Sequence, residues 1–446
     1  MKSFFADDVL LTNESAKRVY QAVKDLPIID YHCHLDQYKI ADDYEFENIG
    51  EIWLAGDHYK WRAMRLCGVD EELITGKASW KDKFVAYATI FPKLIGNPLY
   101  YWTQLELKQV FGINKPLNKD TALEIYEEAN KFIKKEHLSV RKVLKRFNLE
   151  FIATTDDPVD TLEKHGSYEG IEIRPTFRPD KLYTLDEEYL QKLGKVAGFD
   201  VSTLSGLKNA LINRLDYFVS KGCRISDHAF LDFPIKIADE KEAEKLYSKR
   251  DKLTPEEKDM FLGWLVKFLM KEYKKRDIIV QLHFAVVRNV NSPAKAKIGV
   301  DSGYDVMSEE ATLSLVTQLL DSLPDEERPT IVLYTLNPTT IPALATLTGA
   351  FRNVLIGAAW WFNDALLGIR HNLEHVSEYA ALGTNLGMLT DSRSFTSYVR
   401  FDFFRRILST FIGERVERGE YDENEAVKLA TDICYNNIKS LLMKGK

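Results

Sequence analysis

Residues 27–35 read PIIDYHCHL, and this segment is the most informative one in the chain. Two isoleucines begin a short apolar run, and polar residues follow at its C-terminal end. Because side chains alternate between the two faces of a strand, His32 and His34 point the same way and Cys33 points away. Two imidazoles side by side are suitable ligands for a divalent metal such as zinc. The alternative is a pair of structural histidines at a strand end.

Short apolar runs of the same kind recur along the chain, each with a polar residue near its C-terminal end. Continuous runs of this length are typical of strands buried on both faces of a parallel sheet. Amphipathic segments such as 309–323 and 371–382 lie between them and are predicted to be helices. Strand–helix alternation repeated eight times predicts an α/β protein with a TIM-like (β/α)8 barrel. The predicted strands are residues 27–31, 150–153, 171–176, 222–226, 278–282, 330–334, 353–357 and 386–390.

Residues 36–149 interrupt this alternation between the first and second predicted strands. They read as mostly helical, which predicts a helical subdomain inserted in the first strand–helix connection. We therefore expect residues 1–35 and 150–446 to form the barrel, and the inserted subdomain to contribute to its active site. Connections that follow barrel strands lie at the catalytic face, where they shape or cover a site.

The residues that end the strands of a barrel meet at one opening. Asp391 ends the last predicted strand, which closes against the first one, so it can complete a metal site with His32 and His34. This third ligand disfavours the purely structural interpretation of the two histidines. The acids, histidines and arginines gathered at this opening are hard to explain by packing alone. The strand-end residues are His32, His34, Asp156, Asp157, Arg178, Asp227, His228, His283, Asn337, Trp360, Trp361, Asp391 and Arg393.

Composition and charge limit the partners of the chain. Its 446 residues carry a net charge of −7 at pH 7, which argues against nucleic acid as the main partner. No stretch is long and apolar enough for a membrane span, and we expect no signal peptide at the N-terminus. The four cysteines are widely spaced, which suits a reducing compartment. We expect a cytoplasmic protein that binds neither nucleic acid nor membranes; the sequence leaves its oligomeric state open, including a homo-oligomer.

Longer strings of residues resemble one family throughout the chain. A His-x-His on the first strand with an aspartate after the last strand resembles the amidohydrolase superfamily of metal-dependent barrels. Within it, the chain is similar to the uronate isomerase (glucuronate isomerase) family, and the strings follow that family's order over nearly the whole sequence. They are DYHCHL at 30–35, WLAGDHYKWRAMR at 53–65, IGNPLYYWTQLEL at 95–107, TFRPDK at 176–181, SDHAF at 226–230, QLHFAVVRN at 281–289, GAAWWFND at 357–364 and LTDSRSF at 389–395.

The resemblance implies an aldose–ketose isomerase that converts D-glucuronate to D-fructuronate and D-galacturonate to D-tagaturonate. It implies proton transfer through a cis-enediol: Asp391 moves the proton of C2 in an open-chain substrate, beside one divalent metal ion, for which zinc is expected. Arg393 and Tyr59 would stabilise the intermediate. His283 matches a family histidine that is either a further metal ligand or a hydrogen-bond partner, and the sequence leaves both open.

The expected partner is a small hexuronate, and its binding residues combine the resemblance with side-chain chemistry. Arg178 and Arg393 carry planar guanidinium groups that match carboxylate geometry. The resemblance assigns uronate binding to Arg178 and the reacting end of the substrate to Arg393. Asp227 matches an active-site acid of the family. Trp361, with Trp360, can offer an apolar wall to a sugar face, or can instead belong to the core.

Two other functions compete with isomerisation. A metal-dependent hydrolase or lactonase of the same superfamily needs an activated water, and many binuclear members carry a lysine after the fourth strand. Here the fourth strand ends in Ser226-Asp227-His228, which favours one metal ion and, together with the two arginines, an isomerase. The second alternative is a sugar-acid binding protein on a barrel that has lost catalysis. A complete set of metal-ligand candidates argues against it.

Overall fold

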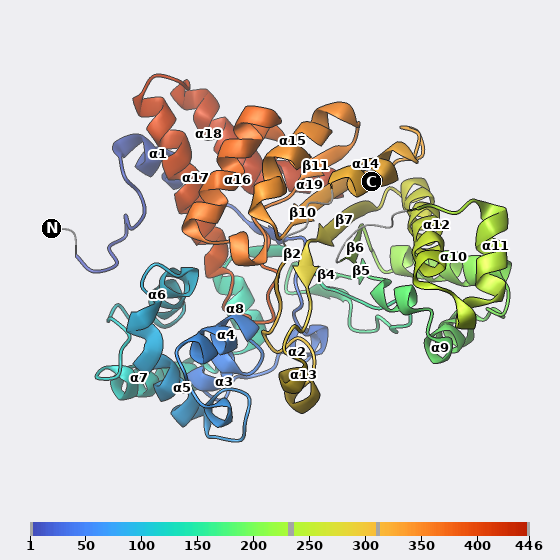
Figure 1. The fold of residues 1–446 in the computed structure, drawn as a ribbon. Helices are drawn as coiled ribbons and strands as arrows, with labels where there is room; N and C mark the ends of the chain where they lie inside the picture. The colour runs from blue at the N-terminus through green and yellow to red at the C-terminus, as the bar shows by residue number, and fades with distance from the viewer. Residues whose placement is uncertain (1–2, 231–235, 309–312, 444–446) are drawn as a thin grey trace.

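The computed structural model describes residues 3–230, 236–308 and 313–443, and Figure 1 shows short strands near the centre with helices around them. The architecture is α/β with mostly parallel strands, which confirms the α/β part of the predicted fold class. None of the helices in these ranges combines the length and the apolar character that a bilayer crossing requires. Outside residues 36–149 the α-helices are α1 (Glu14–Val23), α9 (Glu187–Ala197), α10 (Leu204–Ser220), α11 (Glu240–Ser248), α12 (Pro255–Lys275), α13 (Ser292–Ile298), α14 (Leu313–Asp321), α15 (Ile341–Ala350), α16 (Leu366–Tyr379), α17 (Val399–Glu417), α18 (Glu423–Thr431) and α19 (Asn437–Leu442).

The strands form two larger sheets and one short pair. They are β1 (Ile28–Asp30), β2 (Leu149–Ala153), β3 (Gly166–Tyr168), β4 (Ile171–Arg174), β5 (Thr176–Phe177), β6 (Ile225–Ala229), β7 (Ile279–Phe284), β8 (Val286–Val287), β9 (Val306–Met307), β10 (Ile331–Thr335) and β11 (Val354–Ile356). The first sheet has the order β1-β2-β4-β3, in which only β3 is antiparallel. The second has the order β11-β10-β7-β6-β5, and all its pairings are parallel. Every predicted strand except the last therefore overlaps an observed strand.

The two sheets meet where β4 passes into β5. Pro175 lies between these strands, and proline has no N–H with which to continue a ladder. Asp156 bridges this junction, because its carboxylate accepts the Thr176 N–H at 3.1 Å and its own N–H bonds to Thr176 O at 3.1 Å. Asp156, one of the predicted strand-end residues, therefore stabilises the junction of the two sheets.

The prediction of an eighth strand at residues 386–390 is wrong, because this segment is irregular in the structure. Gly387 has a φ of 72° and Asp391 a φ of 46°, and neither angle is compatible with an extended strand. The segment still approaches the end of β1: the Asp391 N–H bonds to His32 O at 3.1 Å, and the His34 N–H bonds to Ser392 O at 3.0 Å. Strand pairing between β11 and β1 is not found among the described residues, so the predicted closed barrel is not shown.

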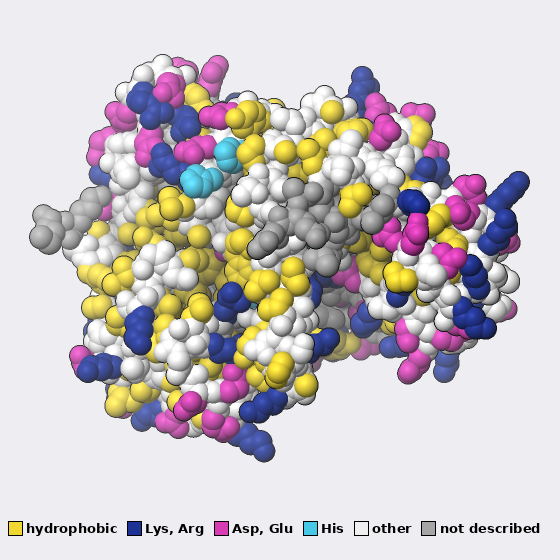
Figure 2. Space-filling view, in the orientation of Figure 1, with side chains coloured by type: hydrophobic (Ala, Val, Ile, Leu, Met, Phe, Trp, Pro, Cys, Tyr) yellow, Lys and Arg dark blue, Asp and Glu magenta, His cyan; other side chains and the backbone are white. Residues whose placement is uncertain are grey.

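The chain between β1 and β2 folds as a group of helices, which Figure 1 shows in blue and cyan at the lower left. Local capping explains where one of them begins: the Asp57 carboxylate accepts the N–H groups of Tyr59 and Lys60, at 3.0 and 3.2 Å. On the face shown in Figure 2, acidic and basic side chains are intermixed, and hydrophobic ones gather over these helices. The helices are α2 (Gln37–Ala41), α3 (Ile49–Leu54), α4 (His58–Leu66), α5 (Trp80–Ile90), α6 (Pro98–Phe111), α7 (Ala122–Glu136) and α8 (Val140–Arg146).

The predicted helices at 309–323 and 371–382 correspond to α14 and α16. Residues 309–312 of the first prediction lie outside the described residues. The second helix begins earlier than predicted, at Leu366, and ends at Tyr379.

Asp30 fixes the irregular segment to β1, and its removal should destabilise the fold. Its fully buried carboxylate accepts the Thr390 N–H at 3.0 Å and the Thr390 hydroxyl at 2.6 Å. We expect Asp30→Ala to lower the free energy of unfolding by about 2–4 kcal/mol, since both bonds involve a charged acceptor. Urea unfolding measures this change. Thr390→Val removes only the hydroxyl bond and should cost less; an Asp30→Ala variant as stable as the parent would contradict the assignment.

Candidate active site

Side chains from β1, β6 and β7 and from the segment around residue 391 meet at the C-terminal edge of the parallel strands. This edge is where α/β proteins place their sites, because the strand ends converge there. A cavity of about 700 Å³ opens at this edge. The predicted site residues that line it are His32, His34, Arg178, His283, Trp361, Asp391 and Arg393.

His32, His34 and Asp391 form one group with the geometry of a metal site. The Nε2 atoms of both histidines lie 3.1 Å from the same oxygen, Asp391 Oδ1. The other oxygen, Oδ2, accepts the indole N–H of Trp360 at 2.8 Å, which fixes the plane of the carboxylate. Ligand atoms from the three residues lie within 4.8 Å of one another. Two imidazole nitrogens and one carboxylate oxygen are a donor set that suits zinc.

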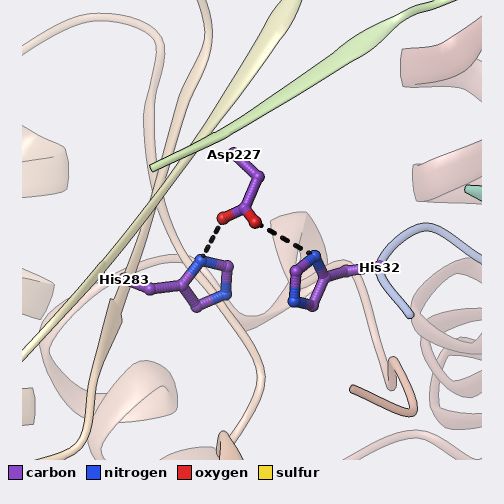
Figure 3. A group of neighbouring side chains, drawn as sticks. All are labelled: His32, Asp227 and His283. Atoms are coloured by element: carbon purple, nitrogen blue, oxygen red, sulfur yellow. Dashed lines mark hydrogen bonds and ion pairs between the residues drawn. The ribbon is translucent and has the colours of Figure 1, made fainter. Parts of the chain in front are cut away.

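His32 also belongs to a second group, with Asp227 and His283, which Figure 3 shows. His283 Nδ1 lies 2.7 Å from Asp227 Oδ1, and His32 Nδ1 lies 3.8 Å from Asp227 Oδ2. Arg178 donates to Asp227 Oδ2 at 2.8 Å. Because this guanidinium already neutralises Asp227, a second cation between Asp227 and His283 would meet repulsion. The group with Asp391 is therefore the better cation site.

Asp227 orients His283 in a way that keeps both predicted roles of this histidine open. Since the Nδ1–H of His283 donates to the carboxylate, Nε2 carries the free electron pair. Nε2 is buried and has no hydrogen-bond partner among the described residues. A histidine held by a carboxylate in this way is the usual arrangement of a metal ligand, and it equally presents an acceptor to a substrate hydroxyl.

The electrostatics of the site favour a bound cation. Burial alone would lower the pKa of His32, but Asp227 and Asp391 outweigh it and raise that pKa. Burial lowers the pKa of His34 to about 4, so this imidazole is neutral at pH 7 and can act as a ligand. Burial alone would raise the pKa of Asp391, whereas its hydrogen bonds with His32 and His34 hold it well below its usual range. The carboxylate is therefore ionised at neutral pH.

Three arginines face the cavity, and each is already paired with carboxylates of the chain. Arg178 donates to Asp227 and to Asp180, both at 2.8 Å. Arg393 lies 3.1 Å from a carboxylate oxygen of Asp301. The third, Arg288, donates to Asp305 at 3.0 Å and was not among the predicted site residues. Its only signal in the sequence is its place in the string QLHFAVVRN.

Tyr59 and Asp227 are buried behind the cavity lining. The Tyr59 hydroxyl donates to Asp364 Oδ2 at 3.1 Å, and Arg400 lies over its ring at 4.5 Å. Burial, followed by the charge of Asp364, raises the pKa of Tyr59 well above its usual range, so the phenol stays protonated. The neighbouring His58 reaches the cavity and meets Trp361 edge-on, with ring centroids 5.7 Å apart.

Some residues that line the cavity were not predicted, and some predicted strand-end residues do not line it. His58 lies on a helix and Asp301 in a loop, so neither has the strand periodicity that marked the predicted residues. His228 hydrogen bonds with Tyr183 in a buried aromatic cluster. Asp157 accepts the Tyr189 hydroxyl at 2.8 Å. Neither His228 nor Asp157 lines the cavity.

Histidines, carboxylates and arginines that converge at the ends of parallel strands are typical of metal-dependent α/β enzymes that act on small anionic molecules. A family model described as glucuronate isomerase matches residues 1–442. The chain belongs to this glucuronate isomerase family.

Similar proteins and structures agree with this family over the whole chain. A uronate isomerase of Caldanaerobacter subterraneus subsp. tengcongensis is 43% identical, over 99% of this chain and 100% of its own length. A crystal structure of uronate isomerase from Thermotoga maritima has a TM-score of 0.95 at 37% identity and covers 99% of this chain and 100% of its own. A glucuronate isomerase structure from Caulobacter crescentus has a TM-score of 0.94 at 27% identity, covering 99% and 97%.

Metal content should depend on the group that contains Asp391. We expect about one divalent ion per chain in the purified protein, and its loss from His32→Ala and His34→Ala, because each removes a nitrogen ligand. Elemental analysis after dialysis measures this. The matched control is His58→Ala, a cavity histidine outside both groups, which should keep the ion. Equal metal content in the parent protein and His32→Ala would show that neither candidate group binds the ion, because His32 belongs to both.

Proposed function

We propose that this chain is an aldose–ketose isomerase of open-chain hexuronates, which converts D-glucuronate to D-fructuronate and D-galacturonate to D-tagaturonate. The observation that carries this proposal is that Asp391, four histidines and three arginines border one cavity of about 700 Å³. A carboxylate for proton transfer and cations for a sugar acid are what such a reaction needs. The names of the similar proteins also support an isomerase over the hydrolase and sugar-acid binding alternatives.

We further propose that the strands form a distorted (β/α)8 barrel of the amidohydrolase type, made of residues 1–35 and 150–446. The segment at Asp391 and Ser392 would complete the barrel through its backbone bonds to β1. A side chain from β7 supports this curvature, because the Gln281 amide donates across to Tyr31 O at 2.8 Å. Residues 36–149 would be the inserted helical subdomain. A cytoplasmic location and assembly into a homo-oligomer stay predictions.

Arg178 would hold the substrate carboxylate. Its bonds to Asp227 and Asp180 fix the plane of the guanidinium and leave further N–H donors facing the cavity. Trp361 lines the same cavity and would pack against the apolar face of the sugar chain. Held in this way, the substrate would turn C1 and C2 towards the metal group.

Asp391 would transfer the proton. It takes the proton of C2, the electrons of that C–H bond form the C1=C2 bond of a cis-enediol, and the π electrons of the C1=O bond move to O1, which takes up a proton from solvent. The proton then returns to C1 through the electrons of the C1=C2 bond, while the electrons of the O2–H bond form the C2=O bond of the ketone and the O2 proton is released to solvent. Arg393 would stabilise the negative charge that develops on the oxygens, and Trp360 would keep the Asp391 carboxylate in place. For Tyr59 to take part, as the family resemblance implies, its hydroxyl would have to turn from Asp364 towards the cavity. One divalent ion, which we expect to be zinc, would supply Lewis-acid polarisation of the substrate oxygens when bound to His32, His34 and Asp391.

Arg178→Lys should weaken uronate binding although it keeps the charge. Lysine lacks the planar fork that meets a carboxylate through two bonds. Losing one charge-assisted bond costs about 1.5–3 kcal/mol, so the KM for D-glucuronate should rise at least about tenfold. Steady-state kinetics measures this rise. Unchanged values of KM and kcat/KM would show that Arg178 is not the carboxylate clamp.

Asp391→Asn should lower kcat by at least about 100-fold, because positioned acid–base catalysis contributes about this much. Metal content is measured in parallel, so that loss of the base can be told apart from loss of the ion. Turnover of D-glucuronate in D2O should place deuterium at C1 of the ketose, read by NMR, since Asp391 exchanges its proton with solvent. Absence of deuterium together with an active Asp391→Asn variant would exclude this mechanism.

A further inference from the structure

A loop of the chain places one of its own carboxylates in the cavity. This loop, residues 299–305, follows α13 and leads into β9. The Asp301 carboxylate pairs with Arg393 at 3.1 Å, two residues from the proposed base Asp391. Both side chains are partly exposed: the Asp301 side chain is 47% accessible and that of Arg393 33%.

The loop is held from the other side by α4. Arg62 donates to Gly303 O at 3.2 Å and to Asp305 O at 3.0 Å. Arg65 donates to Ser302 O, and its guanidinium lies 4.5 Å over the ring of Tyr304. The same helix carries Tyr59 and His58. The position of Asp301 is thus fixed by the helix that shapes the site.

Asp301 and Arg393 form part of the wall between two cavities. Both residues line the cavity of about 700 Å³ and also a neighbouring one of about 510 Å³. Burial would raise the pKa of Asp301, but the charges of Arg393 and Arg288 outweigh it and lower that pKa, so the carboxylate is ionised at neutral pH. A fixed negative charge therefore borders the end of the cavity where Asp391 lies.

We propose that Asp301 is a specificity-determining residue that disfavours sugar acids with a second carboxylate at the reacting end. An unpaired Arg393 would attract such a carboxylate. Paired with Asp301, Arg393 keeps N–H donors for the substrate oxygens, while the aspartate adds a negative charge that repels a second carboxylate and tolerates an aldehyde or a hydroxyl group. Repulsion of the wrong ligand is a general source of specificity. The inference rests on the proposed function, which places the reacting carbons at this end.

Two sugar acids that cannot isomerise test this inference by calorimetry. L-Gulonate carries an alcohol where D-glucuronate carries its aldehyde, and D-glucarate carries a second carboxylate at that position. Asp301→Asn removes the charge, and asparagine tolerates the φ of 55° at this position. We expect the variant to bind D-glucarate at least about threefold more tightly, a change in the range of a partly exposed ion pair, with L-gulonate changed less than about twofold.

Asp301→Glu is the matched control, because it keeps the charge and should keep the preference of the parent protein. An unchanged ratio of the two affinities in Asp301→Asn would overturn the proposal, and so would equal tightening of both ligands. Binding of neither ligand to the parent protein would overturn it as well. Turnover of D-glucuronate is measured separately, so failure of the Asp301 proposal is distinguishable from failure of the isomerase function.

Discussion

The Asp391 carboxylate is the group on which the rest of the site depends. Oδ1 lies 3.1 Å from the Nε2 atoms of His32 and His34, and Oδ2 accepts the indole N–H of Trp360. The backbone N–H of Asp391 bonds to His32 O. This arrangement requires a backbone φ of 46°, which an ordinary strand residue does not adopt. The bonds of Thr390 to β1 hold the chain in that conformation. The loss of regular strand structure here therefore serves the site.

Charge compensation organises the cavity around this carboxylate. Burying a positive charge costs free energy unless a negative charge lies beside it. Here each arginine of the cavity is paired with at least one aspartate. Arg178, the most buried one, is paired by Asp227 on one side and Asp180 on the other. Arg393 is more exposed and has the single partner Asp301. The arginines are therefore oriented before a substrate arrives, which lowers the cost of ordering them on binding.

Strand periodicity made much of the site predictable from the sequence. The alternation of side chains places His32 and His34 on one face, and parallel strands bring Asp227 and His283 to the same edge. The irregular segment before Asp391 was not predictable as such, because its conformation depends on bonds to Asp30, far away in the sequence. Asp301 in a loop and His58 on an inserted helix were not predicted either, because strand periodicity says nothing about which side chains of loops and inserted helices reach the cavity.

The inserted helices reach the cavity through His58 of α4, and buried ion pairs fix this helix in place. Lys60 of α4 is buried between Asp57 and Glu106, at 2.8 and 3.3 Å, and Glu106 in turn accepts the hydroxyl of Thr396 at 2.9 Å. Moving α4 away from the strand ends would expose or unpair these charges, and breaking a buried ion pair is strongly unfavourable. The loop 299–305 is held by hydrogen bonds to its backbone carbonyls and by two ion pairs, Arg393–Asp301 and Arg288–Asp305. Because α4 also carries Arg62 and Arg65, which bind this loop, the buried charges that fix the helix fix the loop at the cavity as well.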